Sequence, residues 1–273
     1  MRYGIVLTAG DLRTQGDLAA EAEAAGWDGV FTWDGIAVGL DAWDPWVAMA
    51  VFALRTERVT LGAIVTPPAR RRPWKLAREA LSIDHLSGGR LVLPFGLGAV
   101  DDGGFAKVGE PTDRATRAGR LDETMALLER FWTGEAVAFR GEHYRVGGMT
   151  IRPRPVNGRI PVWVVALWPK PKSMTRAYEA DGVLIAVARP DDPYTTPTPA
   201  ELVEIAVAGR AARGPAAPWE IIIEGTTPTG DPAAASAAVQ PLAEAGATWW
   251  IESPWEAPSV EGLRARIAAG PPR

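Results

Sequence analysis

The chain has 273 residues, a mass of 29.2 kDa and a formal net charge of −4 at pH 7. This length is typical of a single α/β barrel, and the acidic balance argues against an overall electrostatic attraction to nucleic acid. The absence of cysteine from the sequence excludes disulfide bonds, thiolate metal ligands and a cysteine nucleophile.

The start of the chain and its hydropathy predict a cytoplasmic protein. No apolar run approaches the roughly 18 residues that a membrane span needs. The first residues, MRYGIVLTAG, enter a strand-like run directly, without the charged, apolar and small-residue segments of a signal peptide. We therefore expect one domain over residues 1–273 that acts on a small-molecule substrate and binds neither nucleic acid nor a membrane.

A helix-to-strand cassette occurs three times along the chain. It reads EAEAAGWDGVFTW at 21–33, RAYEADGVLIAV at 176–187 and PLAEAGATWWIES at 241–253. Each copy ends an alanine-rich helix at glycine or Asp-Gly, because glycine adopts the left-handed conformation that a helix end requires. A continuous apolar strand follows, and such strands are typical of parallel sheets covered on both faces. The repeat therefore predicts βα units.

The same reasoning over the whole chain predicts eight strands and eight helices. We expect strands near residues 3–8, 29–33, 58–65, 90–97, 161–167, 182–187, 219–225 and 247–252. We expect helices near residues 15–25, 44–55, 73–86, 116–132, 172–180, 199–212, 232–245 and 259–269. Eight alternations in a chain of this length favour a closed (β/α)8 TIM barrel over an open doubly wound sheet.

One interval is too long for a simple connection. Residues 98–160 separate the fourth strand from the fifth and contain a polar glycine-rich loop and an amphipathic helix. The segment AVAFRGEHYRVGGMTIRPRP, also within this interval, predicts a β-hairpin that turns at Gly141. Because the interval is too small for its own core, we interpret it as an insertion between the fourth and fifth strands.

The barrel fold predicts where functional residues lie. In such barrels the chemistry takes place at the carboxyl ends of the strands, and the opposite face stabilises the fold. Asp34 directly follows the second strand, so we expect its side chain at the mouth of the barrel. It would hydrogen-bond a cofactor ring or take up a proton, or else cap the turn at Asp34-Gly35. Both interpretations stay open.

Other polar and aromatic groups at strand ends also have two interpretations. The arginines at 70–72 follow the third strand and would bind an anionic cofactor tail or line a solvated helix entrance. The threonines at 226–227 follow the seventh strand, where barrels often hold phosphate, or form a plain turn. Trp33 and Trp168 end strands and would face a ligand or pack at the rim.

The histidines do not indicate a metal site. The chain has two: His85, in the last turn of a predicted helix on the stabilising face, and His143, in the inserted hairpin. Two separated histidines without cysteine give no cluster for zinc or iron. GxSxG, HExxH and Walker motifs do not occur in the sequence. We therefore expect no metal ligands.

Three long segments of the chain resemble one protein family. They read WKLAREALSIDHLSGGRLVLPFGLG, GRLDETMALLERFWTGEAVAFRGEHYRV and RPRPVNGRIPVWVVALWP, and they occur in this order. They are similar to the luciferase-like monooxygenases, which include F420-dependent oxidoreductases. The resemblance implies a (β/α)8 barrel with an insertion after the fourth strand and FMN or coenzyme F420 at its carboxyl-terminal mouth. Members activate oxygen on reduced flavin or exchange hydride with the deazaflavin F420, and homodimers are common among them.

The resemblance also implies a set of cofactor contacts. The ring would lie near Asp34, Thr66, Pro67 and Gly96, with the phosphate toward Ala166, Leu167 and Trp168. Some members have a non-prolyl cis peptide bond behind the ring. Because Thr66 precedes a proline in this chain, a cis bond at Thr66-Pro67 would be cheaper than a non-prolyl one.

Three departures from the family pattern fall at these positions. Gly35 follows Asp34 where many F420-dependent members have a histidine that takes part in proton transfer. Pro94 occupies a strand that usually reads Gly-x-Gly, and Ala166 stands where related sequences have a glycine that lets phosphate approach the backbone. These departures are compatible with an unusual cofactor pose, a preference between cofactors, or a barrel without activity.

We predict a flavin- or deazaflavin-dependent oxidoreductase or monooxygenase that acts on a small organic substrate. Asp34 and the arginines at 70–72 favour F420 over FMN. The alternative is a non-catalytic member that binds a ligand or a partner subunit, which the three departures support. A third interpretation, an aldolase or isomerase, needs a lysine or paired acids at the strand ends, and we find Lys170 and Lys172 only in a loop.

Overall fold

Eight parallel strands form a barrel in the computed structural model, which describes residues 1–39, 41–192, 194–256 and 259–273. The barrel strands are β1 (Arg2–Val6), β2 (Gly29–Thr32), β3 (Thr60–Ala63), β4 (Leu93–Phe95), β7 (Val162–Trp168), β8 (Gly182–Val187), β9 (Glu220–Gly225) and β10 (Trp249–Glu252). They follow one another in the order β3-β2-β1-β10-β9-β8-β7-β4. The predicted barrel is confirmed.

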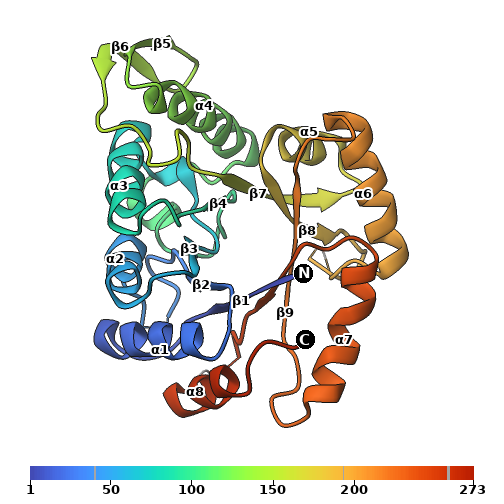
Figure 1. Cartoon of the computed structure of the whole chain (residues 1–273). Helices are drawn as coiled ribbons and strands as arrows, with labels where there is room; N and C mark the ends of the chain where they lie inside the picture. The colour runs from blue at the N-terminus through green and yellow to red at the C-terminus, as the bar shows by residue number, and fades with distance from the viewer. Residues whose placement is uncertain (40, 193, 257–258) are drawn as a thin grey trace.

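Helices surround the barrel and alternate with its strands (Figure 1). They are α1 (Leu12–Ala24), α2 (Pro45–Arg55), α3 (Pro73–Leu86), α4 (Arg114–Trp132), α5 (Pro171–Glu179), α6 (Pro199–Arg213), α7 (Pro232–Glu244) and α8 (Val260–Ala268). Two short 3-10 helices, η1 (Pro68–Arg70) and η2 (Ala106–Val108), lie in loops. Every predicted strand and helix is present, with ends that shift by a few residues, as expected where ends fray.

The barrel closes between β3 and β4 through hydrogen bonds at the two ends of these strands. Near one end, Val92 donates its backbone N–H to Leu61; near the other, Thr66 donates to Pro94 and Gly96 donates to Thr66. The backbone N–H groups of Val92 and Gly96 both point to β3. Because successive N–H groups of a strand point to opposite neighbours, the nitrogen of Pro94 also lies on the side of β3. Proline has no N–H to donate, which explains the gap in the ladder between these ends.

Large aromatic side chains fill the interior of the barrel. The rings of Phe31, Trp163 and Trp249 pack together, with centroids 5.5–6.1 Å apart. They form one buried cluster with aliphatic side chains, namely Val6, Ile64, Val92, Leu184, Ile222 and Ile251. The interior is therefore a packed core at this depth, as is usual for eight-stranded barrels. A ligand must bind above it or outside the barrel.

The predicted insertion after β4 is confirmed. It contains α4 and an antiparallel hairpin of β5 (Ala136–Arg140) and β6 (Arg145–Thr150), which project from one side of the barrel (Figure 1). The Glu123 carboxylate of α4 accepts backbone N–H bonds from residues 142–144 at 2.7–3.2 Å. Gly141 lies in the turn, where a Cβ atom would come within 2.6 Å of this carboxylate. A side chain at position 141 would therefore displace the Glu123 carboxylate from these bonds.

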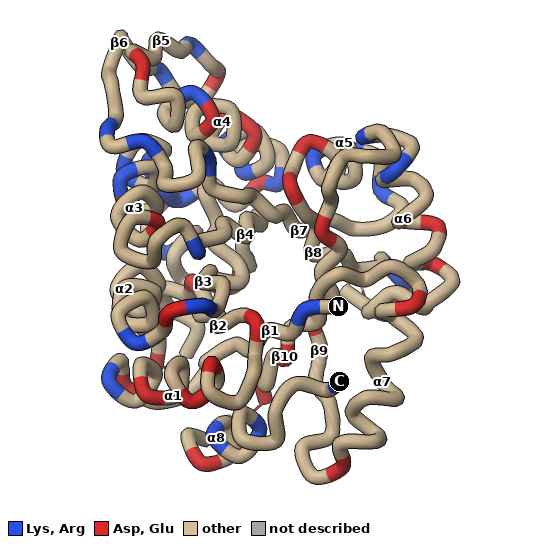
Figure 2. Tube along the Cα trace, in the orientation of Figure 1, with Lys and Arg blue, Asp and Glu red and all other residues tan. Residues whose placement is uncertain are grey.

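Charged side chains of both signs are spread along the outer helices and loops, and fewer lie on the barrel strands (Figure 2). His85 lies near the start of β4, with Nε2 2.8 Å from the backbone oxygen of Arg154. None of the helices that the structure describes has the length and apolar character of a membrane span.

Candidate functional site

Half-buried side chains line the carboxyl-terminal mouth of the barrel. Trp33, Val65 and Val165 pack on the interior cluster and are each partly exposed. Glu224 lies two residues beyond Ile222, a member of that cluster, and the period-two alternation of a strand directs both to the interior. The mouth therefore has an apolar floor, with the carboxyl group of Glu224 at its edge.

Asp34 is at this end of the barrel, and its carboxylate is fully committed to arginine side chains. Arg70 Nη2 donates to Oδ1 at 2.9 Å, and Arg71 donates to Oδ2 from Nη2 at 2.7 Å and from Nε at 3.0 Å. The Asp34 side chain is 0% exposed and that of Arg70 is 4% exposed. The interpretation of Asp34 as a cap of the turn at Asp34-Gly35 does not include these two ion pairs. The role of Asp34 as a cofactor contact stays a prediction.

A second carboxylate completes this network. Asp102 pairs with Arg70 Nη1 and accepts backbone N–H bonds from Ile36, Ala37 and Gly104 at 2.9–3.1 Å. Burial disfavours the charged carboxylate, but the bonds from Gly104, Ala37, Arg70 and Ile36 outweigh this effect and lower the pKa of Asp102 to about 2. Arg70 thereby connects the loops that follow β2, β3 and β4.

The predicted ring contacts Thr66, Pro67 and Gly96 come together where β3 meets β4. Across the seam, Gly96 donates its backbone N–H to Thr66 and Thr66 donates to Pro94, and a Cβ atom on Gly96 would lie 2.7 Å from Val65 Cγ2. Gly96 therefore allows Val65 to lie close to β4. The cis bond in this region joins Ile64 and Val65 and is non-prolyl, so Thr66-Pro67 is not the cis bond.

Of the predicted phosphate contacts, Leu167 alone faces the interior. Trp163 and Val165 belong to the interior cluster, so the alternation of β7 directs Leu167 inward. Ala166 and Trp168 pack instead on the outer core, between the strands and the helices. Immediately beyond, Lys170 is the N-cap residue of α5, and no side chain caps this helix. The structure thus offers a basic helix start next to the mouth.

The threonines after β9 belong to a different network. Glu252 accepts hydrogen bonds from the backbone N–H of Thr227 at 2.7 Å and from its hydroxyl at 2.8 Å. Arg266 Nη2 lies 3.3 Å from the same carboxylate. The guanidinium carbon of Arg266 lies 4.9 Å from the centroid of the Trp27 ring. A carboxylate in this position would repel phosphate. The plain structural interpretation of Thr227 is the better one.

Glu224 is a candidate that the sequence analysis missed. Its carboxyl Oε1 accepts a hydrogen bond from Trp255 Nε1 at 2.6 Å. Burial raises the pKa of Glu224 above its ordinary value of 4.5, although hydrogen bonds from Trp255 and Ser253 act against this. The available signal was an acidic residue directly after the apolar run of the seventh strand, EIIIEG.

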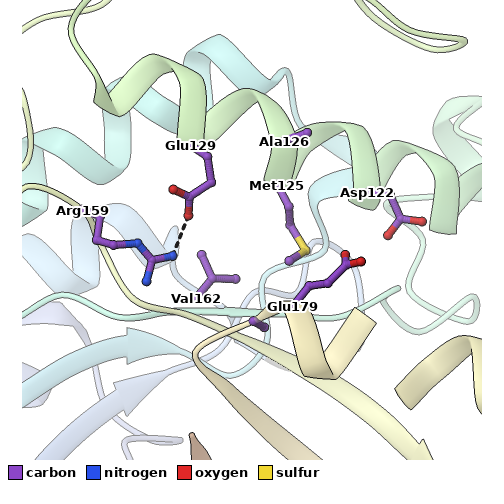
Figure 3. A pocket seen from close by; sticks show the side chains of 8 residues that line it. Asp122, Met125, Ala126, Glu129, Arg159, Val162 and Glu179 are labelled. Carbon is purple, nitrogen blue, oxygen red and sulfur yellow. Dashed lines mark hydrogen bonds and ion pairs between the residues drawn. The ribbon is translucent and has the colours of Figure 1, made fainter. Parts of the chain in front are cut away.

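A cavity on the outer surface lies away from the mouth. Its volume is about 200 Å³, and it lies between α4 and the segment that leads into β7, lined by Met125, Val162, Arg159 and acidic side chains (Figure 3). Arg159 pairs there with Glu129 and with Asp181. The one positive charge of the lining is therefore already paired with carboxylates. Among the residues that the structure describes, no three histidine, aspartate or glutamate side chains are grouped to hold a metal ion.

The sequence profile described as luciferase-like monooxygenase matches residues 2–266, nearly the whole chain. The chain belongs to this family. A relative from Intrasporangium calvum, an F420-dependent glucose-6-phosphate dehydrogenase, is 39% identical over 124 residues, which are 44% of this chain and 36% of that protein. The chain therefore matches less than half the length of that relative.

Two solved structures share the whole fold of the chain. The monooxygenase RslO1 from Streptomyces bottropensis has a TM-score of 0.80, with 22% identity and coverage of 98% of both chains. The F420-dependent tetrahydromethanopterin reductase from Methanopyrus kandleri has a TM-score of 0.78, with 16% identity, and covers 98% of this chain and 97% of its own. At these sequence identities, the structural similarity establishes the barrel fold but says nothing of the reaction.

Proposed function

We propose that the chain is an oxidoreductase that uses coenzyme F420, or FMN as the second candidate, at the carboxyl-terminal mouth of its barrel. Membership in the luciferase-like monooxygenase family is the observation that carries this proposal. The preference for F420 rests on the relative from Intrasporangium calvum. The arginines that first favoured F420 do not support it, because Arg70 and Arg71 are paired with Asp34.

The residues at the mouth fit a flat ring that carries an anionic tail. Trp33, Val65 and Val165 offer partly exposed apolar surface against which the ring would lie. The start of α5, with Lys170 and Lys172, would attract the phosphate, since a helix N-terminus and lysine both favour an anion. When bound, the coenzyme would supply hydride or oxygen chemistry, and the protein would orient the reacting groups and exclude water.

The substrate that this mouth fits best is small and mainly apolar. Large hydrophobic side chains are exposed in the loops after β2, β4, β8 and β10, namely Ile36, Val38, Trp43, Val100, Tyr194 and Trp255. These loops all follow barrel strands at the carboxyl-terminal end, where exposed apolar side chains favour an apolar ligand. The sugar phosphate of the Intrasporangium relative is not carried over, because Arg70 and Arg71 are already neutralised by carboxylates.

Equilibrium titration with each coenzyme tests the proposal. Tryptophan fluorescence reports binding, since the chain has 12 tryptophans and Trp33 lies at the mouth. We expect saturable quenching by F420, weaker quenching by FMN, and little by riboflavin, which lacks the phosphate. If a folded protein binds none of them, the oxidoreductase proposal fails, and the non-catalytic alternative takes its place.

A further inference from the structure

Glu224 is an ionisable side chain at the mouth to which the proposed function gives no role. It lies near the end of β9 and faces the interior side of the barrel, like Ile222 two residues before it. Its side chain is partly exposed. A ligand held over Trp33 and Val65 would be on the same side of the strands as this carboxyl group.

The surroundings of Glu224 are polar on one side only. Trp255 Nε1 donates to Oε1 at 2.6 Å, and the nearby hydroxyl of Ser253 also favours the charged carboxylate. On the other side, Leu184 of β8 pairs with Ile222, so Ala186 lies at the level of Glu224. The site is therefore an apolar wall with a single acidic group.

Charged groups near Glu224 belong to other contacts. Glu252 of β10 is on the outer face of the barrel, where it binds Thr227 and Arg266. Glu256 is exposed. In the described part of the chain, no cation forms an ion pair with Glu224. Burial therefore governs its proton affinity, and it raises the pKa of this carboxyl group.

We propose that Glu224 exchanges a proton with the substrate, and that the substrate carries a hydroxyl or carbonyl group on an apolar frame. This rests on the proposed function, in which the F420 or flavin coenzyme is the hydride acceptor or donor. In oxidation, the substrate O–H bond breaks and the proton forms a new O–H bond on the Glu224 carboxylate. In reduction of the carbonyl group, the same proton returns.

Trp255 acts as a positioning residue in this arrangement. Its indole N–H holds one oxygen of Glu224, and its ring packs edge to face on Trp33, with centroids 6.3 Å apart. The two rings would also contact the apolar frame of the substrate. The carboxyl group thereby has a fixed position beside an aromatic wall, which general acid-base catalysis requires.

Infrared titration of the protein alone tests whether Glu224 holds a proton. We expect a protonated-carboxyl band whose midpoint lies above that of exposed glutamates. It is absent in Glu224→Gln and retained in Glu256→Gln, the exposed control. In Trp255→Phe the midpoint rises further, because the lost hydrogen bond favoured the carboxylate. If the band survives in Glu224→Gln, or its midpoint equals that of exposed glutamates, the proposal is wrong.

Carbodiimide labelling with glycinamide, followed by peptide mass spectrometry, tests whether Glu224 lies at the coenzyme site. We expect labelling of Glu224 to fall severalfold when F420 or FMN is bound, and labelling of Glu256 to stay unchanged. Unchanged labelling of Glu224 in the loaded protein would overturn this proposal alone. Failure of both coenzymes to bind would instead overturn the proposed function, and this inference with it.

Discussion

Arg71 donates two hydrogen bonds to one carboxylate oxygen of Asp34, from Nε at 3.0 Å and from Nη2 at 2.7 Å. The other oxygen binds Arg70, and the Asp34 side chain is 0% exposed. Asp34 therefore pairs with two largely buried arginines, of which Arg70 also pairs with Asp102 and Arg71 also lies 3.9 Å from Glu79. We infer that its first contribution is to the stability of the mouth.

Asp34→Asn tests this inference. Removal of the charge leaves Arg71 without its main partner and Arg70 paired with Asp102 alone, and breaking a buried ion pair costs about 3 kcal/mol or more of the free energy of unfolding. Urea denaturation measures the loss. Asp41→Asn, on the exposed surface of the same loop, is the control and should change little. A loss in Asp34→Asn no larger than in the control would contradict a stabilising role.

Asp102 predicts an acid-dependent loss of stability. Its pKa falls from an ordinary 3.8 to about 2 in the folded protein, so the unfolded chain binds the proton more tightly. The stabilisation, about 2 kcal/mol, is present above pH 4 and disappears as the pH falls through about 2. Denaturation curves of the native protein and Asp102→Asn should therefore converge at low pH. A difference that stays constant with pH would be evidence against the assignment.

Arg117 holds the loop after β4 to α4. Its Nη1 donates to the backbone oxygens of Leu97 at 2.9 Å and Gly98 at 2.8 Å. Arg117→Met removes two charge-assisted bonds, each worth about 1.5–3 kcal/mol. Amide hydrogen exchange should accelerate in residues 97–105. Arg114→Met, exposed on the same helix, should leave those rates unchanged; equal acceleration in both variants would refute the role of Arg117.

Gly96→Ala tests the close packing between β3 and β4. The new methyl group would come within 2.7 Å of Val65 Cγ2 and 3.3 Å of Val165 Cγ2, so the neighbours must shift. We expect a loss of about 1–3 kcal/mol, as in other overpacked cores. Val65→Ala in the same chain should recover part of it. Gly147→Ala, where the added methyl group meets open space, is the control. No recovery in the double variant would contradict this explanation.

Lys170 and Lys172 are expected to bind the coenzyme phosphate. Replacement of both by glutamine should weaken FMN binding severalfold and reduce the salt dependence of binding, because a favourable charge interaction is lost. Fluorescence titration at two salt concentrations measures both effects. Lys75→Gln, on the exposed part of α3, serves as the control. Unchanged affinity in the double variant would place the phosphate elsewhere.

The strands and helices were predictable because their signals are local. Apolar runs between glycine stops located the barrel strands, and the overlong interval located the hairpin around Gly141. The pairing of Asp34 with Arg70 and Arg71 was not predictable. The two arginines follow Asp34 by 36 and 37 positions in the sequence, and they meet it only because the ends of two strands lie side by side. The ion pair of Asp102 with Arg70 was not predictable for the same reason.

Inward and outward positions at the strand ends were harder to assign. For Trp168 the sequence leaves two interpretations, facing a ligand or packing at the rim; the alternation of β7 directs Leu167 inward and Trp168 to the outer core. An error of one residue in a strand reverses its faces. Glu224 was overlooked because an acid after an apolar run is unremarkable until its burial and its contact with Trp255 are known.

A crystal structure of the protein with bound F420 or FMN tests the central claim most directly. The claim predicts the coenzyme ring at the carboxyl-terminal mouth, against Val65 and Trp33, with its phosphate near Lys170 and Glu224 beside the open face of the ring. A ring bound outside the barrel, for example in the cavity between α4 and β7, would contradict the account.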